Sequence, residues 1–305
     1  MTAERLDPMS IHTSPATVHS VFEVGAHKLA VVDGRAGKVG SPVVFIHGIA
    51  LSASLWPMLL KGTPLDECPW ISLGLPGHFP GEAPQGFGRD DATVELFAEC
   101  VNAPVREYFP DTPVHLVGWS TGGFASLAAA TRESGQAASV ISLSGFARGR
   151  WGSHLGTAQT LARNRAGRRV VISALQTVGR SRRLFRWFVQ SLAKRKMDVS
   201  DDLLEVLFED YRQHDMQTMC ELFAGIRELD LTPNLENIEC PVLILGGDAD
   251  RAIPSSEAHH LHEHLPGSSL VEFPGVGHIF FAEALAPSLE QIQGWVRPGE
   301  VRELS

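Results

Sequence analysis

A serine between two glycines is the feature of this sequence that most directly suggests chemistry. Residues 118–122 read Gly-Trp-Ser-Thr-Gly, so Ser120 stands in a Gly-x-Ser-x-Gly pattern. An apolar run, residues 114–117, precedes the pattern, and an alanine-rich stretch, residues 121–132, follows it. A turn from strand to helix would lift the serine out of a sheet and set it beside the free amides that begin the helix. We therefore predict that Ser120 is a nucleophile.

A serine hydroxyl is a weak nucleophile and needs a base beside it. His278 ends the stretch Gly275-Val-Gly-His and follows the last apolar run of the chain. The chain has thirteen histidines, and any one of them is more often a hydrogen-bonded surface residue than a catalytic base. The position of His278 directly after a predicted strand favours the catalytic role. We predict that His278 is the general base.

Two carboxylates are candidates for orienting the histidine. Asp248 and Asp250 both follow the apolar run at residues 242–245. Both lie between Ser120 and His278 in the chain, and this order of serine, acid and histidine is found in one known class of triad. Chain order therefore leaves both aspartates open.

Short apolar runs separated by helix-length segments must position these side chains. The runs cover residues 42–47, 70–73, 114–119, 140–143, 242–245 and 270–273. Continuous apolar runs are typical of parallel strands that are covered on both faces. Residues 18–24 and 28–33 alternate as a hairpin does, and residues 93–109, 121–132 and 285–296 have helical spacing. We predict an α/β fold with a mostly parallel central sheet flanked by helices.

The rhythm stops between residues 143 and 242. Four helical patterns occur there, near residues 170–178, 184–192, 203–211 and 216–226. We predict a helical cap at residues 147–231, inserted into a core of residues 17–146 and 232–305. Residues 1–16 are predicted to be a flexible tail.

Taken together, the chain resembles the α/β-hydrolase superfamily from about residue 22 to residue 296. The resemblance implies the α/β-hydrolase fold, and the family's Gly-x-x-Asp-x-x-x-Pro pattern fits Gly247, Asp250 and Pro254. It therefore selects Asp250 as the orienting carboxylate and leaves Asp248 as a loop residue. The same resemblance implies an oxyanion hole made by the amides of Ile49 and Thr121.

One stretch departs from the family. In many relatives, an aspartate opens the pattern Asp-x-x-Gly-x-Gly-x-Ser directly after the strand that corresponds to residues 70–73. In this chain, residues 74–79 read Gly-Leu-Pro-Gly-His-Phe instead. That segment usually shapes a loop, so the departure concerns local loop structure.

Charge is distributed unevenly along the chain. Residues 148–196 contain thirteen Lys and Arg and no Asp or Glu, so the segment carries +13 and the rest of the chain −22. Arginines can simply coat exposed helices, or they can bind an anionic partner. In the second interpretation, Arg180, Arg182, Arg183 and Arg186 bind acyl carrier protein, coenzyme A or a carboxylated acyl chain. Some family members are carrier-protein methyl esterases. This chain resembles them in having both a Gly-Trp-Ser motif and a basic cap.

The sequence thus predicts a serine hydrolase that cleaves a carboxylic ester or a thioester through an acyl-enzyme, without cofactor or metal. An acyltransferase or cyclase with the same triad, and a non-catalytic binding protein on the same fold, are the alternatives. His259, His260, His262 and His264 are predicted to form a solvated face rather than a metal site. The net charge of −9 argues against nucleic acid. Without an apolar run of membrane-spanning length or a signal segment, a cytoplasmic location is expected.

Overall fold

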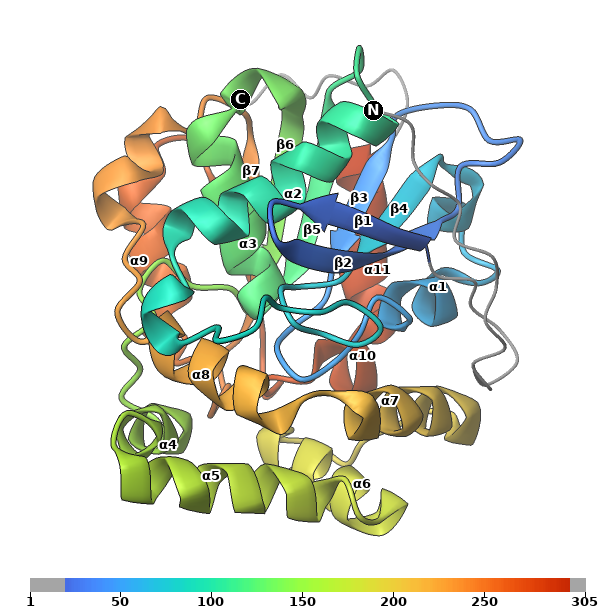
Figure 1. Ribbon diagram of the computed structural model, residues 1–305. Helices are drawn as coiled ribbons and strands as arrows, with labels where there is room; N and C mark the ends of the chain where they lie inside the picture. Colours follow the sequence, from blue (N-terminus) through green and yellow to red (C-terminus); the bar gives the residue numbers. More distant parts are fainter. Residues whose placement is uncertain (1–19, 297–305) are drawn as a thin grey trace.

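A mostly parallel sheet runs through the centre of the protein (Figure 1). The computed structural model describes residues 20–296, and the predicted tail at residues 1–16 lies outside them. The eight described strands are ordered β1-β2-β4-β3-β5-β6-β7-β8. β1 and β2 form an antiparallel hairpin, β2 pairs antiparallel with β4, and the remaining pairs are parallel. The strands are β1 Ser20–Val24, β2 His27–Asp33, β3 Val43–Ile46, β4 Trp70–Leu73, β5 Val114–Trp119, β6 Ala137–Leu143, β7 Val242–Gly247 and β8 Ser269–Phe273.

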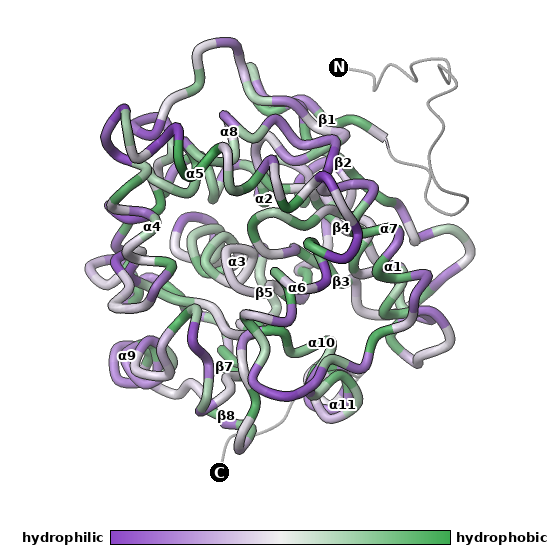
Figure 2. Tube along the Cα trace, turned by 90° about the horizontal axis from the view of Figure 1, so that it is seen from below, coloured by the Kyte–Doolittle hydropathy of each residue, from purple (hydrophilic) through white to green (hydrophobic). Residues whose placement is uncertain are grey.

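Helices cover both faces of the sheet, because the central strands are apolar on both sides. Phe97 of α2, Phe124 of α3 and Leu261 of α9 pack in the core on one face. Trp56 of α1 and Ile292 of α11 pack on the other face. Figure 2 shows these two groups of helices on opposite sides of the strands. The covering helices are α1 Leu55–Leu60, α2 Val94–Tyr108, α3 Thr121–Arg132, α9 Ser256–His264, α10 Phe280–Glu283 and α11 Leu285–Val296.

A helical insertion lies between β6 and β7 and covers the end of the sheet shown at the bottom of Figure 1. Its helices are α4 His154–Ala162, α5 Arg165–Val178, α6 Arg182–Leu192, α7 Asp201–Gln213 and α8 Met216–Ile226. Four of them match the predicted helical patterns, whereas α4 was not predicted. The boundaries at residues 147 and 231 stay a prediction, since β6 and β7 delimit the insertion only to residues 144–241.

No helix within residues 20–296 is both long enough and apolar enough to span a bilayer.

Candidate active site

Ser120 occupies a sharp turn between β5 and α3. Its φ of 56° lies in the left-handed region, which is uncommon for a residue other than glycine. The turn is possible because the two glycines of the motif are closely packed. A Cβ on Gly118 would lie 2.1 Å from the carbonyl oxygen of Gly122, and a Cβ on Gly122 would lie 2.3 Å from that of Ile46. The spacing Gly-x-Ser-x-Gly therefore reflects contacts that no larger residue could make.

Ser120, His278 and Asp250 form a hydrogen-bonded series. Nε2 of His278 lies 3.0 Å from Oγ of Ser120, and its Nδ1 lies 2.7 Å from Oδ2 of Asp250. The side chains of His278 and Asp250 are only 5% and 3% exposed. With Nδ1–H donating to the carboxylate, Nε2 is free to accept the hydroxyl proton of Ser120. The arrangement can therefore transfer a proton from the serine to the imidazole.

The two candidate carboxylates have different partners. Oδ1 of Asp250 accepts the amides of Ala252 and Ile253 at 2.8 and 2.9 Å, so that Oδ2 is directed to His278. Asp248 is exposed, and its Oδ1 accepts the amide of Gly275 at 2.6 Å. Asp250 therefore orients the histidine. Asp248 instead binds the backbone at Gly275, three residues before His278.

Trp119 contacts both the backbone and the ring of His278, and the sequence did not predict this contact. Its indole Nε1 donates to the carbonyl oxygen of His278 at 3.0 Å, and the two ring centroids are 5.3 Å apart. The amide of His278 donates to the carbonyl of Leu192 at the end of α6. The Gly-Trp-Ser motif singles out this tryptophan in the sequence. It does not indicate the hydrogen-bond partner of the indole, which lies 159 residues away.

Glu283 joins the loop of His278 to the helical insertion. One of its carboxylate oxygens, Oε1, accepts the amides of Lys194, Arg195 and Gly277 at 2.7–3.0 Å. The guanidinium of Arg195 donates to the carbonyl of Gly275 at 3.0 Å. Arg195 therefore fastens this loop, although its charge had been counted with the basic surface of the cap. No signal in the sequence pointed to these contacts.

The two amides predicted to form the oxyanion hole belong to Ile49 and Thr121. Thr121 is the first residue of α3, where amides have no partner inside the helix. Within residues 20–296, no acceptor takes either amide proton. Ile49 lines the same cavity as Ser120 and His278. Neither amide is therefore taken up within the described part of the chain, and their role as an oxyanion hole stays a prediction.

A cavity of about 350 Å³ lies above Ser120 and His278. Its walls come mainly from the insertion and include Trp151, Leu175 and Phe223. Among the described residues that line it, none is Asp, Glu, Lys or Arg. The size is within the usual range of small-molecule sites. The cavity is therefore suited to a neutral, apolar group.

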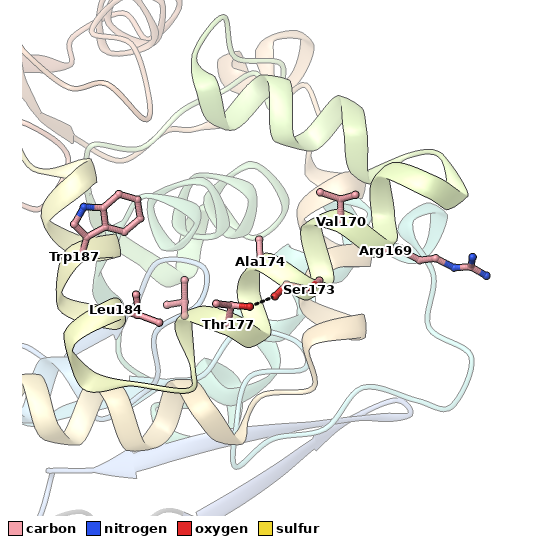
Figure 3. Close-up of a pocket in the computed structure, with 8 residues that line it drawn as sticks. Arg169, Val170, Ser173, Ala174, Thr177, Leu184 and Trp187 are labelled. Atoms are coloured by element: carbon pink, nitrogen blue, oxygen red, sulfur yellow. Dashed lines mark hydrogen bonds between the residues drawn. The ribbon is translucent and has the colours of Figure 1, made fainter.

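An open groove runs along the outer side of the cap between α5 and α6 (Figure 3). Val170, Ala174, Val178 and Trp187 line both this groove and the cavity. Val170 and Trp187 are 65% and 67% exposed, which is unusual for such large apolar side chains. Arg169 lies at the end of the groove and points away from it. The wall that separates the cavity from the surface is therefore thin, apolar and close to a cation.

About half of the cations of the basic segment are paired. Arg182 contacts Asp201 and Glu205 at 3.0 and 2.9 Å, and Arg186 contacts Asp201 at 3.5 Å. Four others form ion pairs with acidic residues from elsewhere in the chain: Arg148, Arg150, Arg163 and Arg168. Seven cations have no ion pair within the described part of the chain: Arg165, Arg169, Arg180, Arg183, Lys194, Arg195 and Lys196, of which Arg195 donates to backbone carbonyls instead. Of the four arginines proposed for an anionic partner, only Arg180 and Arg183 are unpaired.

The histidines of α9 do not all face solvent. His259, His262 and His264 are exposed, but His260 is half-buried and its Nε2 lies 2.8 Å from Oγ1 of Thr232. Ligand atoms of His260, Glu263 and His264 lie within 4.8 Å of one another. Nδ1 of His264 is hydrogen-bonded to the carbonyl of His260. The absence of a metal site stays a prediction.

Known proteins resemble this chain over most of its length. The family described as "Alpha/beta hydrolase family" matches residues 43–287. A pimeloyl-[acyl-carrier protein] methyl ester esterase of Neisseria meningitidis is 28% identical over 251 residues, which cover 80% of this chain and 90% of that protein. An esterase with the same name from Xanthomonas campestris is 28% identical over 268 residues, covering 83% and 94%.

Solved structures resemble it as well. A putative lipase from Acinetobacter baumannii has a TM-score of 0.72 at 18% identity and covers 92% of this chain and 90% of its own. The esterase RhEst1 from Rhodococcus has a TM-score of 0.71 at 22% identity, with coverage of 92% and 98%. At such identities the similarity establishes the fold.

Proposed function

The chain belongs to the alpha/beta hydrolase family, and from this membership we propose that it is a serine esterase. The observation that carries the proposal is the hydrogen-bonded series of Ser120, His278 and Asp250 at the base of an apolar cavity. A base that is oriented by a buried carboxylate and bonded to a serine is the arrangement that activates a hydroxyl for acyl transfer.

In the first half of the reaction, Ser120 attacks the carbonyl carbon of the ester while its proton passes to Nε2 of His278. The amides of Ile49 and Thr121 donate to the resulting oxyanion, a contribution of about 2.7–4 kcal/mol for each donor. Asp250 stabilises the imidazolium. The tetrahedral intermediate then collapses, the carbon–oxygen bond of the ester breaks, and His278 returns the proton to the departing alkoxide as the alcohol leaves.

In the second half, a water molecule replaces the alcohol. His278 takes one proton from the water, and the hydroxide that forms attacks the acyl-enzyme. The same two amides stabilise the second oxyanion. Ser120 leaves with the proton held by His278, so that the products are the free acid and the unmodified enzyme.

The cavity favours a neutral acyl group. A free carboxylate inside it would lose its hydration without gaining a cationic partner, and an unpaired buried charge is costly. We therefore propose an aliphatic acyl chain, or one whose distal carboxyl group is esterified or lies outside the cavity. A carboxylated chain held inside the cap, one of the interpretations of the sequence, is disfavoured.

A carrier-linked substrate is the finer form of this proposal. Two curated relatives carry the name of an esterase for pimeloyl-[acyl-carrier protein] methyl ester. The thin apolar wall at Ala174 would let a long acyl chain pass from the cavity to the outer groove. The unpaired Arg169, Arg180 and Arg183 supply cations for the phosphate of the carrier's prosthetic arm or for its acidic surface. The cytoplasmic location expected from the sequence accompanies this proposal.

Three alternatives use the same fold. A thioester would be cleaved by the same groups, and an acyltransferase or cyclase would bring an alcohol or amine in place of water. A non-catalytic binding protein has no need of an aligned serine, histidine and aspartate, so this series argues against it.

Labelling and hydrolysis test the proposal together. We expect a fluorophosphonate probe to label the protein but not Ser120→Ala. We expect hydrolysis of p-nitrophenyl esters, with kcat lower by several orders of magnitude in Ser120→Ala and unchanged thermal unfolding. Acyl-coenzyme A and a carrier-linked methyl ester, assayed beside them, distinguish a thioesterase from an esterase. Labelling without hydrolysis of any substrate, even with added acceptor alcohols, would contradict the proposed activity.

A further inference from the structure

Three histidines that the proposed mechanism does not use lie in a row, with neighbouring rings packed edge to face. The ring centroids of His47 and His78 are 4.9 Å apart, and those of His78 and His214 are 5.2 Å apart. They come from the end of β3, the loop after β4 and the end of α7. All three are buried. The core and the helical insertion therefore meet at this row.

Both nitrogens of each ring are hydrogen-bonded to the backbone. Nε2 of His78 accepts the amide of Ala50 at 3.0 Å, so its Nδ1–H donates to the carbonyl of Pro76. Nδ1 of His214 accepts the amide of Phe79 at 3.0 Å, so its Nε2–H donates to the carbonyl of Leu51 at 3.1 Å.

His47 follows the same pattern. Its Nε2 accepts the amide of Leu75 at 3.2 Å, and its Nδ1–H donates to the carbonyl of Gly48. Burial lowers the pKa of all three rings, that of His78 to about 4. The neutral form supplies the one donor and one acceptor that each position requires.

These bonds hold residues 48–52, the segment that contains Ile49. The three rings bind the carbonyl of Gly48, the amide of Ala50 and the carbonyl of Leu51. Oγ of Ser52 donates to Oδ2 of Asp210 at 2.6 Å. Ala50 has a φ of 64°, a strained value for a residue with a side chain. Such a conformation persists only where surrounding contacts enforce it.

Two of the four bonds come from α7 and its end. His214 and Asp210 belong to the helical insertion, while the segment they hold belongs to the core. Titratable groups near the row are the other two histidines, Tyr211, whose ring centroid is 6.2 Å from that of His214, and Asp210. The position of the Ile49 amide therefore depends on how α7 packs against the core.

We infer that His214 is a positioning residue for the oxyanion hole, acting through its bond to Leu51. The inference rests on the proposed esterase function, in which the amide of Ile49 stabilises the oxyanion. Its physical basis is preorganisation, since a donor already in place contributes more to the transition state than one that must be reoriented. The helical insertion therefore does more than form the cavity, because it also holds part of the catalytic apparatus in place.

Two substitutions of His214 separate its two bonds. In His214→Gln, the amide nitrogen lies near the position of Nε2 and can still donate to Leu51. In His214→Asn, the amide oxygen lies near the position of Nδ1 and can still accept from Phe79, but the bond to Leu51 is lost. Each variant deletes one hydrogen bond, so a purely structural role predicts similar effects for both.

Kinetics and inhibitor binding are the readouts. Removing an oxyanion donor outright costs 10²–10³-fold in kcat, so loosening one should cost about tenfold. We expect kcat for p-nitrophenyl butyrate to fall about tenfold in His214→Asn, with KM within about twofold of the parent, and to stay near the parent in His214→Gln. A trifluoromethyl ketone, whose adduct with Ser120 bears an oxyanion, should lose affinity by the same factor in His214→Asn.

Hydrogen exchange of residues 48–52 gives a readout without catalysis. We expect faster exchange there in His214→Asn than in His214→Gln, in the full-length protein. Equal exchange and equal kcat in the two variants would overturn the inference, even if the parent is an active esterase. A parent that neither hydrolyses esters nor reacts with a fluorophosphonate would instead contradict the proposed function, and faster exchange in His214→Asn would then still support the positioning of residues 48–52.

Discussion

Oδ2 of Asp250 lies 2.7 Å from Nδ1 of His278, at the only end of this carboxylate that the backbone amides of its own loop do not occupy. Two amides hold the other oxygen, so the carboxylate cannot rotate away from the imidazole. Asp248, two residues earlier, has no such contact with the histidine among the described residues and binds the amide of Gly275 instead.

We predict that Asp250→Asn lowers kcat for a neutral ester by about 10⁴-fold, because an amide stabilises the wrong tautomer and leaves the imidazolium without a counter-charge. Asp248→Asn is the matched control and should lower kcat by less than about tenfold, since its amide oxygen can still accept from Gly275. Steady-state kinetics with p-nitrophenyl butyrate measures both. A larger loss in Asp248→Asn would show that the roles of the two aspartates are reversed.

The wall between the cavity and the outer groove should determine which acyl-chain lengths the enzyme hydrolyses. Ala174 lines both spaces, and in Ala174→Phe the larger ring would thicken this wall and block the proposed route of a long acyl chain. We predict that kcat/KM for p-nitrophenyl decanoate falls roughly tenfold or more, while that for the acetate changes little, because only the longer chain reaches the wall.

Gln176→Phe is the control for the pocket variant, because Gln176 lies on the same helix and lines neither space. It should leave the ratio of the two esters unchanged. An equal loss for acetate and decanoate in Ala174→Phe would show that the chain takes another direction.

Unpaired arginines should contribute more to carrier binding than paired ones. The double variant of Arg180 and Arg183 to Gln, and that of Arg182 and Arg186 to Gln, remove the same formal charge. Only the first pair is free to contact an anionic carrier directly, since Arg182 and Arg186 bind Asp201. We predict the larger rise in KM for a carrier-linked methyl ester in the first variant, and no change in either for p-nitrophenyl butyrate.

Salt should mimic that variant. Raising the ionic strength from about 20 to 200 mM shortens the Debye length from roughly 20 to 7 Å. KM of the parent for the carrier-linked substrate should rise, whereas the neutral ester should be unaffected. Equal effects of the two arginine pairs on KM would indicate long-range attraction without direct contact. An unchanged KM in all cases would show that the arginines only coat exposed helices and bind no anionic partner.

The buried histidine row should make stability depend on pH. Burial lowers the pKa of His78 from the usual 6.5 to about 4, so between these values the unfolded chain binds a proton that the folded chain does not. Stability is therefore present in full above about pH 6.5 and is lost as the pH falls toward 4, by about 1.4 kcal/mol per pH unit for each such histidine.

Urea unfolding between pH 7.5 and 4.5 measures this slope. In His78→Gln the titrating group is gone, while the amide oxygen can still accept from Ala50. We predict that the slope of unfolding free energy against pH decreases by about 1.4 kcal/mol per unit below pH 6.5, and that parent and variant run parallel above pH 7. Parallel curves over the whole range would show that protonation of His78 is not linked to unfolding.

Local sequence determined the turn at Ser120 and the elements around it. Gly118 is close to the carbonyl of Gly122 within the motif itself, although Gly122 is close to the carbonyl of Ile46 on β3, and apolar runs that pack on both faces are characteristic of parallel strands. For the same reason most strands and the helices α5 to α8 lie close to where the apolar patterns predict them. The choice of Asp250 came from a short family pattern within one loop.

Only the tertiary structure decided what each of several other side chains does. The arginines at 182 and 186 meet acidic residues of α7, Trp119 meets a carbonyl 159 residues away, and His214 meets one 163 residues away. Each such contact depends on how whole elements pack, and it leaves no periodic signal in the chain. A charge or a histidine has the same letter in the sequence whether it faces solvent or completes a buried hydrogen bond, so its role follows from the neighbours that folding brings to it.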